Sequence, residues 1–163
     1  MSLNVFDFGI KMEEEGEVYY REKAASCPDP NAQALLMLLS REERRHGDLI
    51  RSLKEGLSGV QYTSFLKDVR TVFEEMARTG AVFTANRTSM IGTLEDALKI
   101  EEKSIDLYDR EAKEAEESEL RELCLLLKKE EQAHYSLVNS MIEFYDRPSQ
   151  WLEQAEFTHL DEY

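Results

Sequence analysis

The sequence has few residues that interrupt helices and no local concentration of positive charge. Only three prolines and seven glycines occur in 163 residues. This scarcity favours long helices, since both residue types are disfavoured in helix interiors. Lysine and arginine number 20 against 34 aspartates and glutamates, which gives a net charge of −14. Because no basic cluster breaks the acidic trend, binding to nucleic acid or to an anionic membrane surface is not expected.

Long apolar runs and paired cysteines are also missing. No run approaches the ~18 apolar residues of a membrane-spanning helix, and the N-terminus has no apolar signal region. Cys27 and Cys124 do not form a Cys-x-x-Cys pair, and we interpret both as reduced structural residues. We therefore expect a cytoplasmic protein. The length predicts one domain, residues 1–163, with room for a real core.

The most informative pattern present is an internal repeat. Glu-x-x-His occurs twice, and the two copies are 88 residues apart. An ungapped alignment of residues 5–50 with 93–138 gives 12 identities in 46 positions. The six candidate metal ligands recur with this offset: Glu13 and Glu101, Glu43 and Glu131, and His46 and His134. We therefore predict two repeated units, residues 5–55 and 93–143.

Four long helices are predicted from apolar residues spaced three and four apart. They span about 5–27, 30–54, 93–117 and 119–145. Asp29, followed by a proline, can cap the second helix, and Gly56 can end it. Thr93 with Asp96 resembles a capping box and predicts that the third helix opens there, after a loop.

The lengths of the connections predict the architecture. The helices within each repeat are joined by a few residues, so they are expected to be antiparallel neighbours. Almost 40 residues separate the two pairs, and residues 64–78 within them have a helical pattern of their own. The chain is therefore predicted to be all-α: two helical hairpins and a long crossover carrying an extra helix, which is the ferritin-like four-helix bundle. A short C-terminal segment follows, and the apolar crossover predicts a homodimer.

The repeated residues have the composition of a dinuclear metal site. Each lies near the middle of its helix, where antiparallel pairing brings such positions together. We expect the following roles: bridging of two ions by Glu43 and Glu131, terminal binding by Glu13 and Glu101, and one nitrogen each from His46 and His134. Four carboxylates nearly balance two divalent cations. Such an oxygen-rich set with two imidazoles suits iron or manganese, and zinc less specifically.

Each of these residues, taken alone, has an ordinary explanation. Glu13 belongs to a run of three glutamates typical of solvated helix surface. A lone Glu-x-x-His means little, because Glu156 and His159 also form one, without a glutamate 30 residues upstream. Only the joint repeat on apolar stripes favours a metal site. Tyr20 and Tyr108 are more often core aromatics, but they follow a ligand glutamate by two turns and could hydrogen-bond the ligands from outside.

These segments resemble a known family. MEEEGEVYYREKA and IEEKSIDLYDREA are similar to the first and third helices of rubrerythrin-like proteins. LSREERRHGDLI and LKKEEQAHYSLV are similar to their second and fourth helices, and the tail PSQWLEQAEF resembles the ending of many short members. The resemblance implies a di-iron site at the six residues named above. It also implies reaction with peroxide or dioxygen.

Two departures from the family pattern affect the expected function. Full-length rubrerythrins end in a rubredoxin-like domain with paired Cys-x-x-Cys motifs, which this sequence lacks, so we expect an external electron donor such as a rubredoxin-like protein. Those proteins also carry an extra carboxylate where this chain has Ser104. The resemblance thus implies an oxidoreductase, either a peroxidase or a ferroxidase. The alternatives are a ferritin-like iron storage protein and a non-catalytic metal-binding bundle.

Overall fold

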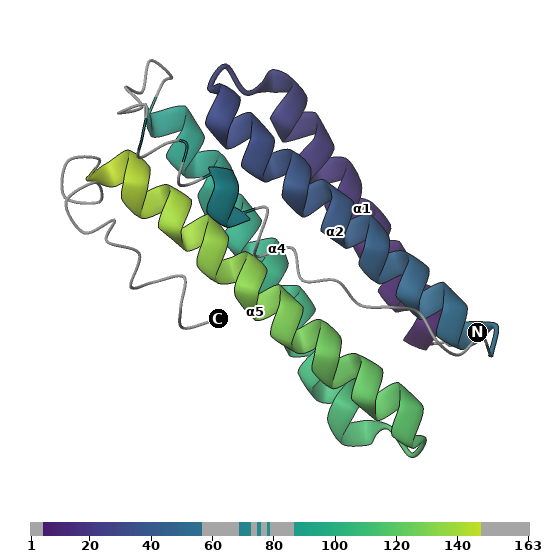
Figure 1. Cartoon of the computed structure of the whole chain (residues 1–163). Helices are drawn as coiled ribbons and strands as arrows, with labels where there is room; N and C mark the ends of the chain where they lie inside the picture. The colour runs from purple at the N-terminus through teal and green to yellow at the C-terminus, as the bar shows by residue number, and fades with distance from the viewer. Residues whose placement is uncertain (1–4, 57–68, 73–74, 76–77, 79–86, 148–163) are drawn as a thin grey trace.

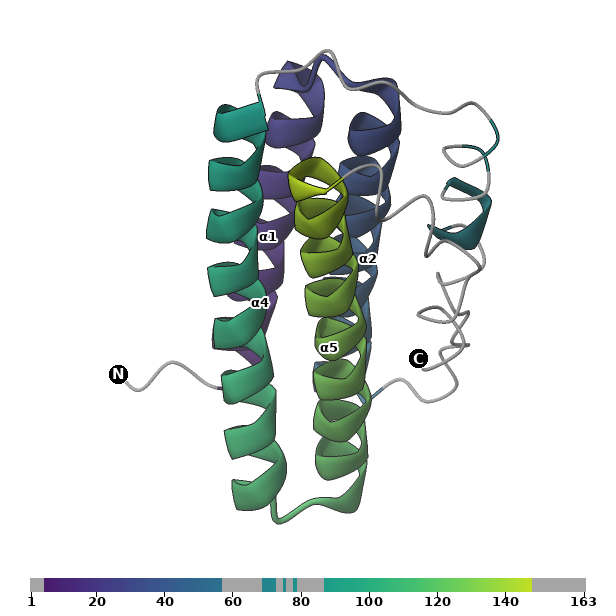
Figure 2. The ribbon, with the colours of Figure 1, turned by 90° about the vertical axis from the view of Figure 1, so that its left-hand side faces the viewer.

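The computed structural model describes residues 5–56, 69–72, 75, 78 and 87–147. Its long helices are α1 (Val5–Ser26), α2 (Pro30–Lys54), α4 (Arg87–Glu114) and α5 (Ser118–Asp146). α1 lies beside α2 and α4 beside α5 (Figure 1), and the four run along a common axis (Figure 2). The predicted all-α, ferritin-like bundle is therefore confirmed. Within the described part of the chain, no helix is long and apolar enough to cross a membrane.

The ends of α2 follow from local sequence. The Asp29 carboxylate accepts hydrogen bonds from the backbone N–H groups of Asn31 (2.9 Å) and Ala32 (3.1 Å), and Pro30 occupies the first position of the helix. At the other end, Gly56 has a φ of 71°, a conformation that glycine adopts without steric cost. Both signals were predicted from the sequence.

The predicted start of the third helix is wrong. α4 begins at Arg87, so Thr93 lies inside the helix, where its hydroxyl donates to the Ser89 carbonyl at 3.1 Å. Threonine can make this bond to the preceding turn as readily as it can cap a helix. The apolar stripe decides between the two, because Met90 is buried in register with Leu94. That stripe extends the helix toward its N-terminus.

The apolar core forms two clusters at opposite ends of the bundle. The larger one contains the end of α1, the start of α2, the start of α4 and the end of α5, and Val69 packs into it from the crossover. The smaller cluster, around Leu49 and Leu127, lies at the other end. Because the starts of α2 and α4 share one end, the end of α2 and the start of α4 lie at opposite ends of the bundle. Polar residues occupy the middle, between the clusters.

Other sequence-based predictions have different outcomes. Both cysteines are free, as expected. Within the predicted crossover helix, the described residues 69–72, 75 and 78 are helical. The C-terminal segment, including Glu156 and His159, lies outside the described residues.

Candidate metal centre

Six polar side chains from four helices meet in the middle of the bundle. They are Glu13 of α1, Glu43 and His46 of α2, Glu101 of α4, and Glu131 and His134 of α5. Each is at most 2% exposed to solvent. A buried carboxylate without a compensating charge is costly, and here four are buried together. Such a cluster requires cations or protons to neutralise it.

The two imidazoles and the carboxylates of Glu43 and Glu131 are arranged with approximate two-fold symmetry. His46 Nδ1 lies 2.8 Å from Glu131 Oε1, and His134 Nδ1 lies 3.0 Å from Glu43 Oε1. Each imidazole thus faces the carboxylate of the other hairpin. The two rings are stacked, with centroids 5.2 Å apart and planes inclined by 12°. The sequence repeat is therefore also a repeat in space.

The possible ligand atoms form two groups, each compact enough to surround one ion. Within each group, one ligand atom per residue lies within 4.8 Å of all the others. The groups are Glu13, Glu43, His46 and Glu131, and Glu43, Glu101, Glu131 and His134. Glu43 and Glu131 belong to both, in agreement with the bridging role expected of them. The structure thus brings all six sequence-predicted ligands together, and that they bind metal remains our proposal.

The orientation of these groups suits metal ions better than direct hydrogen bonds. Glu13 Oε2, Glu101 Oε2 and both Glu131 oxygens are buried without a hydrogen-bond partner in the described structure. His46 Nδ1 also lacks an aligned hydrogen bond, although it lies 2.8 Å from Glu131. Close atoms that do not point at each other are typical of ligands directed at a common centre. The residues therefore fit a pair of divalent cations.

In the metal-free protein, protons would replace part of the missing positive charge. Burial raises the pKa of Glu13 well above its usual range, and the nearby Glu131 and Glu43 carboxylates raise it further. Burial also raises the pKa of Glu101, with Glu43 adding to the effect. For His46, burial lowers the pKa, but Glu131 and Glu13 outweigh it and raise the pKa to about 10. Burial therefore favours the protonated carboxyls of Glu13 and Glu101, and the His46 imidazole holds a proton at neutral pH.

Metal binding should therefore release protons. Because divalent cations bind ionised carboxylates and neutral imidazoles, we expect metal binding near pH 7 to release protons from the centre. Since fewer protons must be displaced at higher pH, metal affinity should rise with pH and fall as these groups protonate. Calorimetric titration in two buffers of different ionisation enthalpy would measure the release. An observed enthalpy independent of the buffer would contradict it.

Two tyrosines connect the hairpins through the terminal carboxylates. The Tyr20 hydroxyl on α1 donates to Glu101 Oε1 on α4, and the Tyr108 hydroxyl on α4 donates to Glu13 Oε1 on α1. Burial, together with the Glu101 carboxylate, raises the pKa of Tyr20 well above its usual range, so its proton stays in place. Each tyrosine was expected to support a ligand, and the ligand it contacts lies on the opposite hairpin.

Gly16 is a site residue that the sequence reasoning missed. A Cβ atom at this position would lie 3.0 Å from Glu43 Oε2 and 3.2 Å from its Cδ. The absence of a side chain on α1 therefore allows a bridging carboxylate to pack against the helix backbone. The repeat gave no signal for Gly16, because the corresponding residue of the second repeat is Ser104. Ser104 is buried, and its hydroxyl donates to the Ile100 carbonyl at 3.3 Å.

Gly16→Ala should weaken metal binding more than it weakens folding. The gain in helix propensity, about 1 kcal/mol, opposes an overpacking cost of about 1–3 kcal/mol. The displaced carboxylate should lower metal affinity about tenfold. Zinc titration and chemical unfolding of the metal-free protein would measure the two effects. Gly92→Ala is the control, since its Cβ would meet nothing within 4 Å. Equal zinc affinities in the two variants would contradict the role of Gly16.

Comparison with known proteins identifies the family. No curated protein and no solved structure gave a significant match to the chain. The rubrerythrin family model matches residues 4–142, which include α1, α2, α4, most of α5 and all six residues of the candidate centre. With a bundle of two hairpins and this match over most of its length, the chain belongs to the rubrerythrin family.

Proposed function

We propose that the protein is a di-iron redox protein that reduces hydrogen peroxide or dioxygen with electrons from an external donor. The observation that carries the proposal is the pair of four-residue groups that share Glu43 and Glu131. Membership of the rubrerythrin family supports a di-iron centre. A bound pair of ferrous ions supplies two electrons, the number that reduces one hydrogen peroxide to two waters with uptake of two protons.

The residues around the centre have separate tasks in this reaction. Glu43 and Glu131 would hold both ions, since each belongs to both ligand groups. Tyr20 and Tyr108 hold the terminal carboxylates in orientation and keep a proton on each phenol oxygen. The apolar clusters on either side limit access of bulk water to the centre, which strengthens electrostatic interactions inside it.

The first test is a single-turnover reaction. Anaerobic diferrous protein mixed with hydrogen peroxide should be oxidised once and then stall, because no reductant is present. Adding a small reduced redox protein should restore turnover. Stopped-flow absorbance of the iron would follow the reaction, and zinc-loaded protein, which cannot change oxidation state, is the control. If neither peroxide nor dioxygen changes the iron spectrum, the redox function is wrong.

One observation favours iron oxidation and storage as a second candidate. Ser104 stands where related proteins have an additional carboxylate, and the remaining six ligands form a symmetric set. A ferroxidase would react much faster with dioxygen than with peroxide, and a storage protein would assemble into a large closed shell. The same stopped-flow comparison, together with size-exclusion chromatography, would separate this candidate from the peroxide-reducing protein.

A further inference from the structure

A second polar cluster lies next to the candidate metal centre, between α2 and α5. It consists of Glu42 and Arg45 on α2 and Glu130 on α5, and we call it the α2–α5 cluster. The Arg45 guanidinium pairs with Glu42 and lies 3.7 Å from Glu130. The side chains of Glu42 and Arg45 are 13% and 22% exposed, so they are partly accessible to solvent, unlike the six residues of the centre, whereas Glu130 is buried.

The symmetry of the repeat is broken at this cluster. Glu42 and Glu130 correspond to each other, but the residue that corresponds to Arg45 is Ala133. Arg45 therefore faces both carboxylates with one positive charge, and no guanidinium stands at the corresponding position of the second repeat. The guanidinium pairs with Glu42, the carboxylate of this cluster that lies beside the two imidazoles, so a divalent cation at Glu42 would compete with it.

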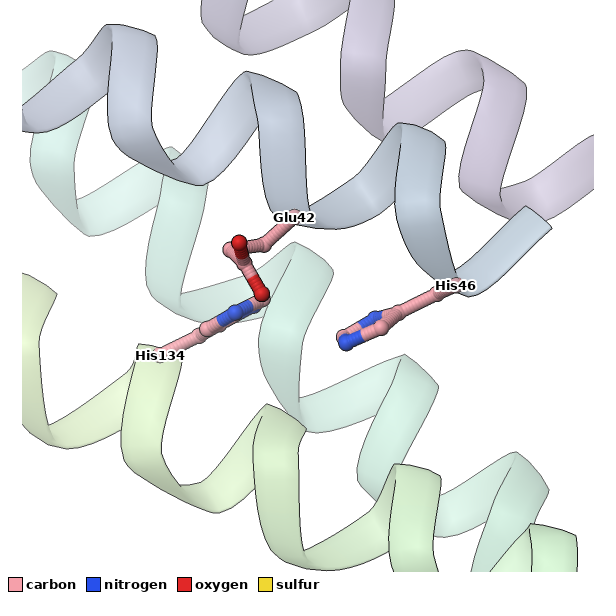
Figure 3. A group of neighbouring side chains, drawn as sticks. All are labelled: Glu42, His46 and His134. Carbon is pink, nitrogen blue, oxygen red and sulfur yellow. The ribbon is translucent and has the colours of Figure 1, made fainter. Parts of the chain in front are cut away.

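Glu42 reaches the two imidazoles of the centre. One carboxylate oxygen of Glu42 and one ring nitrogen each of His46 and His134 all lie within 4.8 Å of one another. Figure 3 shows the carboxylate of Glu42 beside the ring of His134, with the ring of His46 directed toward them. His46 is fully buried, and its Nε2 has no hydrogen-bond partner in the described structure. One carboxylate and two imidazoles are a sufficient ligand set for a divalent ion.

The group of Glu42, His46 and His134 cannot hold a cation while both positions of the centre are occupied. A neutral imidazole has one nitrogen with a free lone pair, because the other carries the proton. His46 can therefore bind an ion beside Glu42 or an ion within the centre, but not both at once. An ion in the group of Glu42, His46 and His134 must therefore leave that group before both histidines can bind ions of the centre.

We propose that Glu42, His46 and His134 form a loading site, where a divalent cation binds before it moves into the buried centre. In the absence of the cation, the Arg45 guanidinium neutralises Glu42, and it moves away when the cation arrives. The proposal deepens the proposed function and rests on metal binding at the centre. Among the carboxylates near the two imidazoles, that of Glu42 is the most exposed to solvent. The chain has a net charge of −14, and so strongly acidic a protein raises the local concentration of cations around it.

Cobalt uptake by the metal-free protein tests the loading site without redox chemistry. Co²⁺ absorbance after stopped-flow mixing reports the rate, and titration reports the final number of ions. Glu42→Gln should slow uptake about tenfold and leave the final number of ions unchanged. Arg45→Ala should speed uptake, because the competing guanidinium is gone. The matched control is Glu130→Gln, which removes the same charge from the corresponding position of the other repeat and should change the rate by less than about twofold.

The possible outcomes separate the loading site from other roles. If Glu42→Gln leaves the uptake rate unchanged, or slows it no more than Glu130→Gln does, the loading site is wrong. If Glu42→Gln weakens equilibrium binding through faster release, with an unchanged uptake rate, Glu42 orients an imidazole instead. Either result leaves the iron oxidation experiment untouched. Wild-type protein that binds no Co²⁺ would overturn the metal centre itself.

Discussion

Glu131→Ala is expected to remove metal from both positions of the centre, whereas His134→Ala should remove it from one. Glu131 belongs to both ligand groups, and His134 belongs to one of them. Wild-type protein loaded with iron or zinc should hold about two ions per chain. The alanine variant of Glu131 should hold almost none and that of His134 about one, as elemental analysis after desalting would show.

A neighbouring glutamate provides the control for this comparison. Glu130 precedes Glu131 in the chain and is also buried, but it belongs to neither ligand group of the centre. Glu130→Ala removes the same charge one residue away and should keep about two ions per chain. Equal metal loss in the Glu131 and His134 variants would contradict the bridging position of Glu131.

Removing metal should lower the melting temperature of the wild-type protein strongly. A ligand present at a thousand times its dissociation constant stabilises the folded state by about 4 kcal/mol. For a chain of this size, 1 kcal/mol corresponds to roughly 2–4 °C, so the shift should be about 8–16 °C. Thermal unfolding followed by circular dichroism, with excess metal and with a chelator, would measure it.

The physical reason for this shift is the buried cluster of like charges. Without metal, the cluster keeps its carboxylates close together in a region that excludes water, which raises the pKa of Glu13 and Glu101. Bound metal ions would replace this repulsion with direct coordination. Glu131→Ala should show almost no metal-dependent shift. A wild-type melting temperature that does not respond to the chelator would argue against a structural contribution from the metal.

Most of the fold could be predicted because periodic patterns and caps are local signals. The predicted span of the second helix coincides with α2, and Asp29 caps it as expected. The start of α4 could not be derived in the same way, because Thr93 can cap a helix or bond to its preceding turn. Burial of Met90 against other helices decides between these conformations. Contacts of that kind are not contained in the local sequence.

The centre was partly predictable for a different reason. A repeat carries information about three-dimensional symmetry, so it identified the six residues that meet in the bundle. It could not tell which hairpin supplies the partner of Tyr20, because that depends on how the two hairpins are packed. Gly16 was missed because the residue that corresponds to it in the second repeat is Ser104. Glu42 was missed because its match to Glu130 in the repeat does not show that Glu42 lies beside the two imidazoles, which is a tertiary contact.

The two-fold arrangement of the ligands means that half of the chain contains the information for the whole centre. Each hairpin contributes two carboxylates and one imidazole, and the second hairpin repeats what the first provides. A single hairpin paired with its own copy would possess all six ligands. Because the two hairpins belong to one chain, they need not be identical, and Arg45 and Gly16 occur in the first repeat alone. The centre thus has the symmetry of a dimer within a single molecule.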